Sequence, residues 1–393
     1  MSRFRFAFKA LSSGLVAVLV GMTSSIAVVF SAAERSGASP SQIGSWIAAI
    51  CISMGVCAIG LSYRYKTPLL LAWSTPGATL LASEAVGERR LSDYIGAFML
   101  CGLLLLATGL TGVYDKMIER IPLSISAALL AGVLTRFALE AFGAVSAKDT
   151  RWMMLAMFFA YVVARRLLPT FAALIVLIVG VIAAQLQGSI GGPKVPLGLV
   201  DLSFVRPTIS IGALIGVGVP LFVVTMAAQN VPGTAALRSH GYDVPISPVL
   251  TVSGVATTLF APFGLFAINL AAITAAMVMG PDIHPDKTRR YPAAMAAGGL
   301  YAIVGLMGGS IAGLIALFPR ALVIGVAAFA LIPTITGGLA NALTDPDQRE
   351  AAVIVFLVTV SGLSLGGIGA PFWALISGVI VLVLRSLKPV RFR

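Results

Sequence analysis

The chain has 393 residues, of which 58% are hydrophobic and 11% are charged, and its mean hydropathy is +0.99. Soluble domains carry about 25% charged residues, so this composition excludes a soluble protein. Apolar runs recur almost from end to end, which predicts a polytopic helical membrane protein; a membrane β-barrel would show short alternating segments instead. The net charge of +12 does not indicate a nucleic-acid partner, because Lys and Arg cluster in short connections between the apolar runs, as the positive-inside rule expects.

The distribution of charge also predicts the orientation. If the spans number about 14, the larger share of the 27 Lys and Arg residues falls on the side of the amino terminus. We therefore expect both termini in the cytoplasm. Residues 1–33 resemble a signal peptide, but the apolar run 11–33 is too long for a signal core, so we expect an uncleaved first span. Cys51, Cys57 and Cys101 lie inside apolar runs and are interpreted as packing residues, not as a disulfide framework or metal site.

Taken in order, the apolar runs divide into two halves. The first half, residues 1–190, has runs at 11–33, 41–61, 68–85, 94–114, 121–142, 152–166 and 168–187. A Gly/Pro-rich connector, 191–209, leads to the second half, 210–393, with runs at 210–229, 246–261, 262–279, 292–317, 320–340, 350–365 and 368–386. Since a transmembrane helix needs about 20 apolar residues, we expect about 14 spans, several of them short.

The third run, 68–85, reads as a broken span. Pro68 to Trp73 is suited to an extended segment, and Ser74-Thr75-Pro76 has the form of a helix start, with a hydroxyl cap and Pro in the first turn. About six extended residues and about ten helical ones add up to roughly 35 Å, enough to cross a hydrocarbon core of about 30 Å. This predicts a short extended segment followed by a half-helix.

The tenth run, 262–279, repeats this pattern in the second half. Pro262, Gly264 and Asn269 lie where an unbroken helix would have its first half, and a stretch rich in Ala follows. Corresponding interrupted spans in two halves point to an inverted repeat with a binding site near the middle of the bilayer. Because seven spans per half is an odd number, the second half would be inverted relative to the first.

The polar residues at these breaks are the candidate site. A half-helix that starts inside the membrane presents unpaired N–H groups and the positive end of its dipole, which suits an anionic group. Ser74, Thr75 and Asn269 are expected to cap these ends and to bond a ligand; the alternative is that they are caps only. Phe266, with Trp73 at the matching position of the first half, is expected to supply an aromatic wall.

Two adjacent amides end the eighth run. Gln229 and Asn230 either line the cavity or simply face water at the helix end, and buried amides need hydrogen-bond partners. Thr225 lies four residues before Gln229 and therefore on a similar helical face. Together, these residues suit a planar apolar body with one carboxylate.

The sequence contains few candidates for proton-carrying, catalytic or metal-binding residues. No acidic residue falls clearly at the middle of a predicted span, so the proton-carrying residue is not identified. We find no HExxH, Walker loop or Cys/His ligand cluster and no nucleophile elbow, so we expect neither an enzyme nor a cofactor or metal.

Three segments in order carry a family resemblance: PLFVVTMAAQNVPGTAALRSHGY (220–242), APFGLFAINLAAITAAMVMGP (261–281) and DIHPDKTRRYPAAMAAG (282–298). They resemble the benzoate transporter (BenE) family of bacterial inner-membrane benzoate:proton symporters. The resemblance implies the uracil-transporter fold, which has fourteen spans in two inverted seven-span repeats. In that fold spans 3 and 10 each combine a short strand with a half-helix, and the substrate lies between them and span 8. It also implies a core domain that moves against a gate domain, often in a homodimer.

One departure concerns the acids that nucleobase carriers of this fold have in spans 8 and 10. The corresponding positions here are Thr225, Gln229, Asn230 and Asn269, all neutral. A carboxylate substrate would be repelled by a buried acid, so this replacement favours an anion. The sequence thus predicts import of benzoate or a close aromatic carboxylate with protons, by alternating access, across the bacterial inner membrane. The alternatives are a carrier of another small anion or a nucleobase on the same fold, and a passive channel.

Overall fold

A computed structural model describes residues 3–83, 89–114, 123–169, 172–190, 199–271, 273–281, 283–363, 365 and 370–386. Its first half contains α1 (Arg3–Arg35), α2 (Pro40–Tyr65), β1 (Leu71–Trp73), α3 (Thr75–Ser83), α4 (Leu91–Thr111), α6 (Leu123–Gly143), η1 (Ala144–Ser146), α7 (Lys148–Leu167) and α8 (Ala172–Leu186).

The second half opens with one helical segment in five parts, α9 (Ile211–Ala213), η3 (Leu214–Gly218), α10 (Val219–Thr225), η4 (Met226–Asn230) and α11 (Val231–Ser239). It continues with α12 (Ile246–Phe260), η5 (Ala261–Phe263), β2 (Ile268–Leu270), α13 (Ile273–Met279), η6 (Lys287–Arg289), α14 (Tyr291–Leu306), α15 (Gly308–Ala316), α16 (Arg320–Ala342), α17 (Arg349–Ser361) and α18 (Ala370–Ser386).

The protein is a helical, multi-pass membrane protein. Within the described residues, six helices are long and apolar enough to cross a membrane, or up to eight if each of two bent pairs is one span. The expected number of about 14 spans is therefore not confirmed by helix length and composition. The expected strand-plus-half-helix segments are present, as β1 with α3 and β2 with α13. These half-helices are too short to satisfy a length criterion for a span, which is one reason why such a criterion finds fewer spans.

Helix α2 shows how local sequence sets a boundary. Ser39 and Gln42 form a capping box, Pro40 occupies the first helical position, and Lys66 ends the helix in a left-handed conformation with φ of 50°. Helix α2 packs along α14, where a Cβ at Gly298 would lie 2.7 Å from the carbonyl oxygen of Gly55. Small residues at this interface let the two backbones approach, as is usual between membrane helices.

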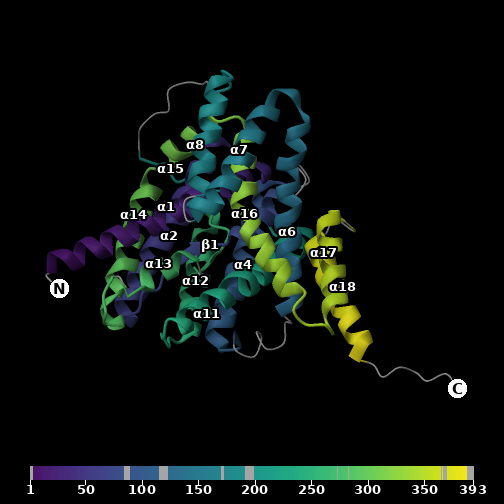
Figure 1. Ribbon diagram of the computed structural model, residues 1–393. Coiled ribbons are helices and arrows are strands. Elements are labelled where there is room, and N and C mark those ends of the chain that lie inside the picture. The colour runs from purple at the N-terminus through teal and green to yellow at the C-terminus, as the bar shows by residue number, and fades with distance from the viewer. Residues whose placement is uncertain are drawn as a thin grey trace.

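The buried apolar side chains form two clusters. The larger one surrounds the two strands and takes residues from most of the helices, whereas the smaller one joins α6, α7, α8 and α16 through Met153, Met154, Met157, Phe329 and their neighbours. In Figure 1, α7 and α8 stand together in the upper part of the molecule, and the strand β1 lies near its centre. Helices α6 and α16 contribute to both clusters, so they join α7 and α8 to the part of the protein that carries the strands, called here the strand-bearing unit.

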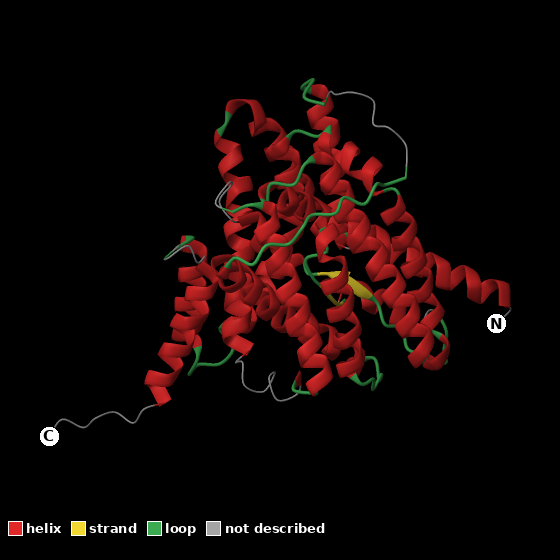
Figure 2. Cartoon of the chain, turned by 180° about the vertical axis from the view of Figure 1, so that it is seen from behind, coloured by secondary structure: helices red, strands yellow, loops and turns green. Residues whose placement is uncertain are grey.

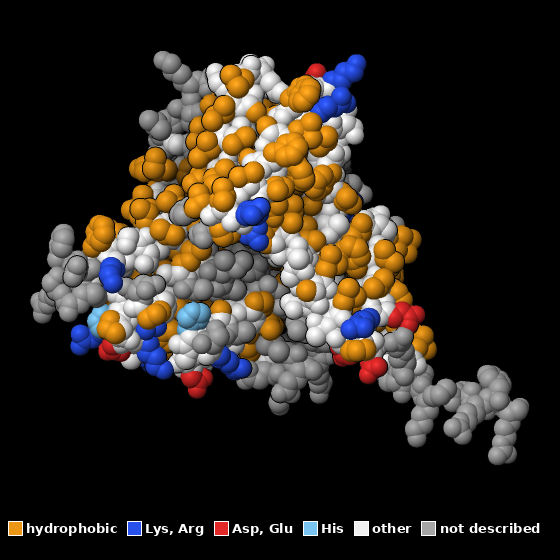
Figure 3. Space-filling view, in the orientation of Figure 1, with side chains coloured by type: hydrophobic (Ala, Val, Ile, Leu, Met, Phe, Trp, Pro, Cys, Tyr) orange, Lys and Arg blue, Asp and Glu red, His pale blue; other side chains and the backbone are white. Residues whose placement is uncertain are grey.

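Exposed apolar side chains cover much of the surface. Figure 3 shows mostly hydrophobic side chains over the middle and upper body, with a basic group near the middle, while charged side chains of both signs and His gather along the lower rim and a smaller charged group lies at the upper tip. Helices α7, α8 and α18 contribute large exposed residues such as Phe159, Ile182 and Ile380. An apolar band between two charged rims is what a bilayer requires of the surface that faces lipid.

Candidate functional site

The two short strands pair with each other in the interior of the protein. They run antiparallel, with Leu71 opposite Leu270, Ala72 opposite Asn269 and Trp73 opposite Ile268, and Figure 2 shows them as a ribbon enclosed by helices. Ile50 and Met54 of α2 point toward β1 from one side. Each strand is followed by a half-helix, α3 or α13. The structure thus brings the breaks in the two halves of the chain together, as the sequence predicted.

A two-stranded ribbon has outer edges whose N–H groups need partners, because the bilayer core holds no water to satisfy them. Side chains of neighbouring helices supply these partners. The amide of Leu270 donates to Oδ1 of Asn230 at 3.0 Å, and the amide of Ile268 donates to Oγ1 of Thr257 at 3.4 Å. Before β1, Ser62 accepts from the amide of Leu69 at 3.0 Å. Asn230, only 1% exposed, therefore supports β2 and does not face water at a helix end.

Ser74 caps α3, as predicted. Its Oγ accepts a hydrogen bond from the amide of Gly77 at 3.1 Å, and the hydroxyl of Thr225 donates to the same oxygen at 2.9 Å. Both side chains are fully buried and neither lines the central cavity described below. Thr75, the next residue, does line it. The cap therefore joins α3 to α10 and leaves Thr75 to face the open space.

Asn269 does not cap a half-helix, and the expectation that it would was wrong. It lies in the middle of β2, whereas α13 begins at Ile273. Its Nδ2 donates to the carbonyl of Leu270 at 3.0 Å and lies 3.5 Å from Oε1 of Gln229, while its Oδ1 is buried and has no hydrogen-bond partner among the described residues. The extended pairing with Ala72 prevails over a helix start at this position.

The helical segment from 211 to 239 differs from the prediction that it ends at the two amides. It continues to Ser239 through two π-helical turns, η3 and η4, and each turn lies just before a proline, Pro220 or Pro232. A π turn widens the helix where proline withholds its N–H, and such turns are frequent at functional sites. In η4, adjacent amides take different directions: Gln229 lines the cavity and Asn230 bonds β2.

A cavity of about 630 Å³ lies beside the ribbon. One wall comes from the strand-bearing unit and includes Trp73, Thr75 and Gln229; the opposite wall comes from α6, α7 and α16 and includes Tyr161 and Phe329. Small-molecule sites commonly have volumes of about 300–1,000 Å³ and mostly apolar walls with few polar groups. Of the lining residues that the structure describes, none is Asp, Glu or His.

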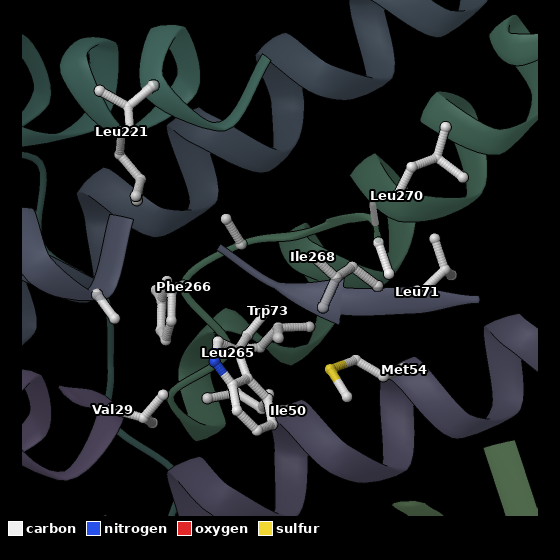
Figure 4. Packing of buried hydrophobic residues seen from close by; sticks show 14 of the residues in the cluster. Val29, Ile50, Met54, Leu71, Trp73, Leu221, Leu265, Phe266, Ile268 and Leu270 are labelled. Atoms are coloured by element: carbon white, nitrogen blue, oxygen red, sulfur yellow. The ribbon is translucent and has the colours of Figure 1, made fainter. Parts of the chain in front are cut away.

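The aromatic wall is only partly the expected one. Trp73 lines the cavity, donates from Nε1 to Oγ of Ser25 at 3.1 Å and meets the ring of Tyr301 edge to face, with centroids 6.3 Å apart. Phe266 instead lies in the hydrophobic core, fully buried and packed against Trp46 and Phe98, as Figure 4 illustrates for its apolar surroundings. Phe266 thus supports the fold and does not line the cavity.

Sequence reasoning missed the opposite wall entirely. Tyr161 stacks on Phe329, with centroids 5.7 Å apart and planes at 22°, and Arg165 follows one helical turn after Tyr161 on α7; all three line the cavity. The i, i+4 spacing of Tyr161 and Arg165 was the available signal. Within the described residues, no group of three or more His, Cys, Asp and Glu is arranged to hold a metal ion.

Comparison with known proteins agrees with this architecture. Residues 5–384 match the BenE family, described as benzoate membrane transport protein. The chain is 39% identical over 377 residues to inner membrane protein YdcO of Escherichia coli K12, covering 96% of each protein. It is 34% identical over 379 residues to the benzoate membrane transport protein of Acinetobacter baylyi, covering 96% of this chain and 95% of the relative.

Two solved structures share the fold. Murine Slc26a9, an anion transporter in the inward-facing state, superposes with a TM-score of 0.65 at 12% identity, over 97% of this chain and 69% of that one. The transmembrane domain of the cyanobacterial bicarbonate transporter BicA gives a TM-score of 0.62 at 13% identity, over 96% of this chain and 98% of that one. The family match and the relatives together span nearly the whole sequence, and this chain belongs to the BenE family.

Proposed function

We propose that this protein is a secondary active transporter that imports benzoate, or a close aromatic carboxylate, together with protons. The observation that carries the proposal is the cavity, in which aromatic side chains of both walls lie near the first turn of α3 and the amide of Gln229. The rings suit an apolar aromatic body. Thr75 offers its hydroxyl and its backbone N–H at the positive end of the α3 dipole, and this combination suits a carboxylate.

Transport would proceed by alternating access. The cavity lies between the strand-bearing unit and the unit of α6, α7, α8 and α16, so relative movement of these units would open it first to one side and then to the other. Pro333 lies inside α16, a helix that lines the cavity, and a proline within a helix favours a bend at that point. The antiparallel pairing of β1 with β2 supports two inverted seven-span repeats, residues 1–190 and 210–393, joined by 191–209, with core and gate units interleaved in sequence.

The coupled proton is proposed to travel without an acidic side chain in the cavity wall. The lining residues that the structure describes include no carboxylate, and desolvation raises the pKa of a carboxylic acid, so the substrate itself can take up the proton as it leaves water. The charge pattern of the connections supports an inner-membrane protein with both termini in the cytoplasm. A homodimer is the assembly we propose from the family resemblance.

The test is uptake of radiolabelled benzoate into proteoliposomes with an imposed pH gradient. We expect saturable uptake that depends on the protein and increases when the outside is acidic. Uptake that ignores both the protein and the gradient would refute the proposal, and uptake that never saturates would indicate a channel. Competition experiments with unlabelled uracil and bicarbonate test the alternative substrates. If the protein prefers a nucleobase or another small anion, that compound will inhibit uptake of radiolabelled benzoate.

The cavity assignment has its own test in two substitutions. Gln229→Ala and Asn269→Ala remove the amides that face each other at 3.5 Å beside the cavity. We expect weaker benzoate uptake at unchanged protein abundance. Normal transport by both variants would exclude this part of the wall from the binding site.

A further inference from the structure

We propose that Arg165 is the residue that selects a negatively charged substrate. Its guanidinium would bind the carboxylate inside the cavity, from the wall opposite Gln229 and Thr75. This inference rests on the proposed function, because it assigns a role to Arg165 within the same cavity. The role of Arg165 specifies the substrate class: the cavity would bind aromatic monoanions in preference to neutral aromatic compounds of the same shape.

The placement of Arg165 supports this role. It is the only Lys or Arg among the described lining residues, and its side chain is exposed and not enclosed by the packed core. No acidic side chain among the described residues lies within ion-pair distance of it. Tyr161, which also lines the cavity and carries no charge of its own, interacts with Arg165 electrostatically and through a side-chain hydrogen bond. The positive charge of Arg165 thus remains available to a ligand.

A basic residue at a helix end can also serve only to orient the helix in the membrane. Comparison of Arg165 with its neighbour Arg166 distinguishes this role from charge selection. Arg165 and Arg166 are both exposed and both lie in the last turn of α7, but only Arg165 lines the cavity. Consecutive helical residues point about 100° apart, so the two guanidinium groups take different directions. A role in orienting the chain would be shared by both arginines, whereas charge selection would belong to Arg165 alone.

The chemistry of the pair fits an aromatic acid. A guanidinium presents a planar fork of donors that matches a carboxylate with two parallel hydrogen bonds, and such charge-assisted bonds are among the stronger ones in proteins. The rings of Tyr161 and Phe329 lie on the same wall as Arg165, beside the place where the aromatic ring of the substrate would lie. A neutral analogue of the same shape cannot form these charge-assisted bonds, so a site that uses them favours the anion.

The experiment compares Arg165→Gln with its matched control, Arg166→Gln. Both variants lose one positive charge from the same helical turn, so effects on insertion and net charge are equal. The purified proteins are tested for thermal stabilisation by benzoate and by benzamide in detergent, and for benzoate uptake in proteoliposomes. Arg165→Lys is included as a conservative variant that keeps the charge but not the fork.

We expect wild type and Arg166→Gln to prefer benzoate over benzamide. Arg165→Gln should lose this preference and raise the benzoate concentration for half-maximal effect about tenfold or more, the size of a lost charge-assisted hydrogen bond. The benzoate preference and affinity of Arg165→Lys should lie between those of wild type and Arg165→Gln. If Arg165→Gln fails to fold, a normal preference and affinity in Arg165→Lys would count against the bidentate role of Arg165. Arg165→Gln with the same affinity and preference as Arg166→Gln would overturn the inference.

The two proposals fail in different ways. If benzoate stabilises wild type but is not taken up, transport is refuted, and loss of this stabilisation in Arg165→Gln still supports the role of Arg165. If wild type takes up benzoate and all variants do so equally well, transport stands and the role of Arg165 is refuted. If wild type neither binds nor transports benzoate, both proposals are refuted.

Discussion

Replacing Asn230 tests whether the ribbon edge depends on a side-chain partner. Asn230→Leu keeps the branched shape and the number of side-chain heavy atoms but removes the oxygen that accepts from the amide of Leu270 at 3.0 Å. The residues around β2 are fully buried, so no water molecule replaces the lost acceptor. A buried N–H left without a partner costs about 1–3 kcal/mol, so we expect the free energy of unfolding to fall by about that amount. A denaturant titration in mixed micelles, followed by tryptophan fluorescence, measures it.

Two further substitutions make this measurement decisive. Thr257→Val removes the other edge acceptor, but the bond to the amide of Ile268 is longer, 3.4 Å, so a smaller loss is expected. Gln229→Ala changes the adjacent amide, which lines the cavity, and should weaken benzoate uptake with little loss of stability. The reasoning is refuted if Asn230→Leu is as stable as wild type, or if Gln229→Ala is the more destabilised of the two.

Three further outcomes are expected from buried positions. Ser74→Ala removes the Oγ that caps α3 by accepting from the amide of Gly77 at 3.1 Å. The free energy of unfolding, measured by thermal unfolding in detergent, should fall by about 0.5–2 kcal/mol. An unchanged unfolding midpoint would contradict the capping role. Gly77→Ala places a Cβ 2.5 Å from a methyl of α10 and 2.9 Å from the capping oxygen, so transport should fall more than with Ala at the open position Gly299. A membrane-permeant maleimide should label Cys57, which is partly exposed, before Cys51 and Cys101, which are fully buried; equal labelling of all three in the folded protein would contradict this packing.

The sequence was most informative where local chemistry determines the backbone. Ser74 followed by Thr75 and Pro76 is a helix start in almost any context, and the capping bond that it predicts is present. The paired breaks at 68–85 and 262–279 were found from prolines, glycines and small residues in otherwise apolar runs. Both are strand-plus-half-helix segments in the structure. Backbone-directing residues act over a few positions, so they can be read without knowledge of the packing.

Positions set by tertiary contacts were predicted poorly. Asn269 has the form of a helix cap, but pairing with β1 keeps it extended. The helix through Pro232 was expected to stop, yet a π turn carries it on to Ser239, since an interrupted helix inside a membrane has no water to satisfy its carbonyls. Arg165 reads as an ordinary basic residue at a helix end. Its place in the cavity wall follows from the packing of α7 against α8 and α16, which the sequence does not reveal.

The two walls of the cavity differ in how they are held, and this difference bears on mechanism. On the strand-bearing wall, the side chains of Asn230, Thr257 and Ser74 accept backbone hydrogen bonds that fix the ribbon and the start of α3. On the opposite wall, Tyr161 and Phe329 meet through ring stacking within one unit, and ring stacking tolerates sliding more readily than a directional hydrogen bond does. A substrate whose carboxylate binds Arg165 while its ring lies against Trp73 would contact both walls at once. Its binding energy would then favour the arrangement in which the two units are closest, which is the requirement for a ligand that shifts a conformational equilibrium.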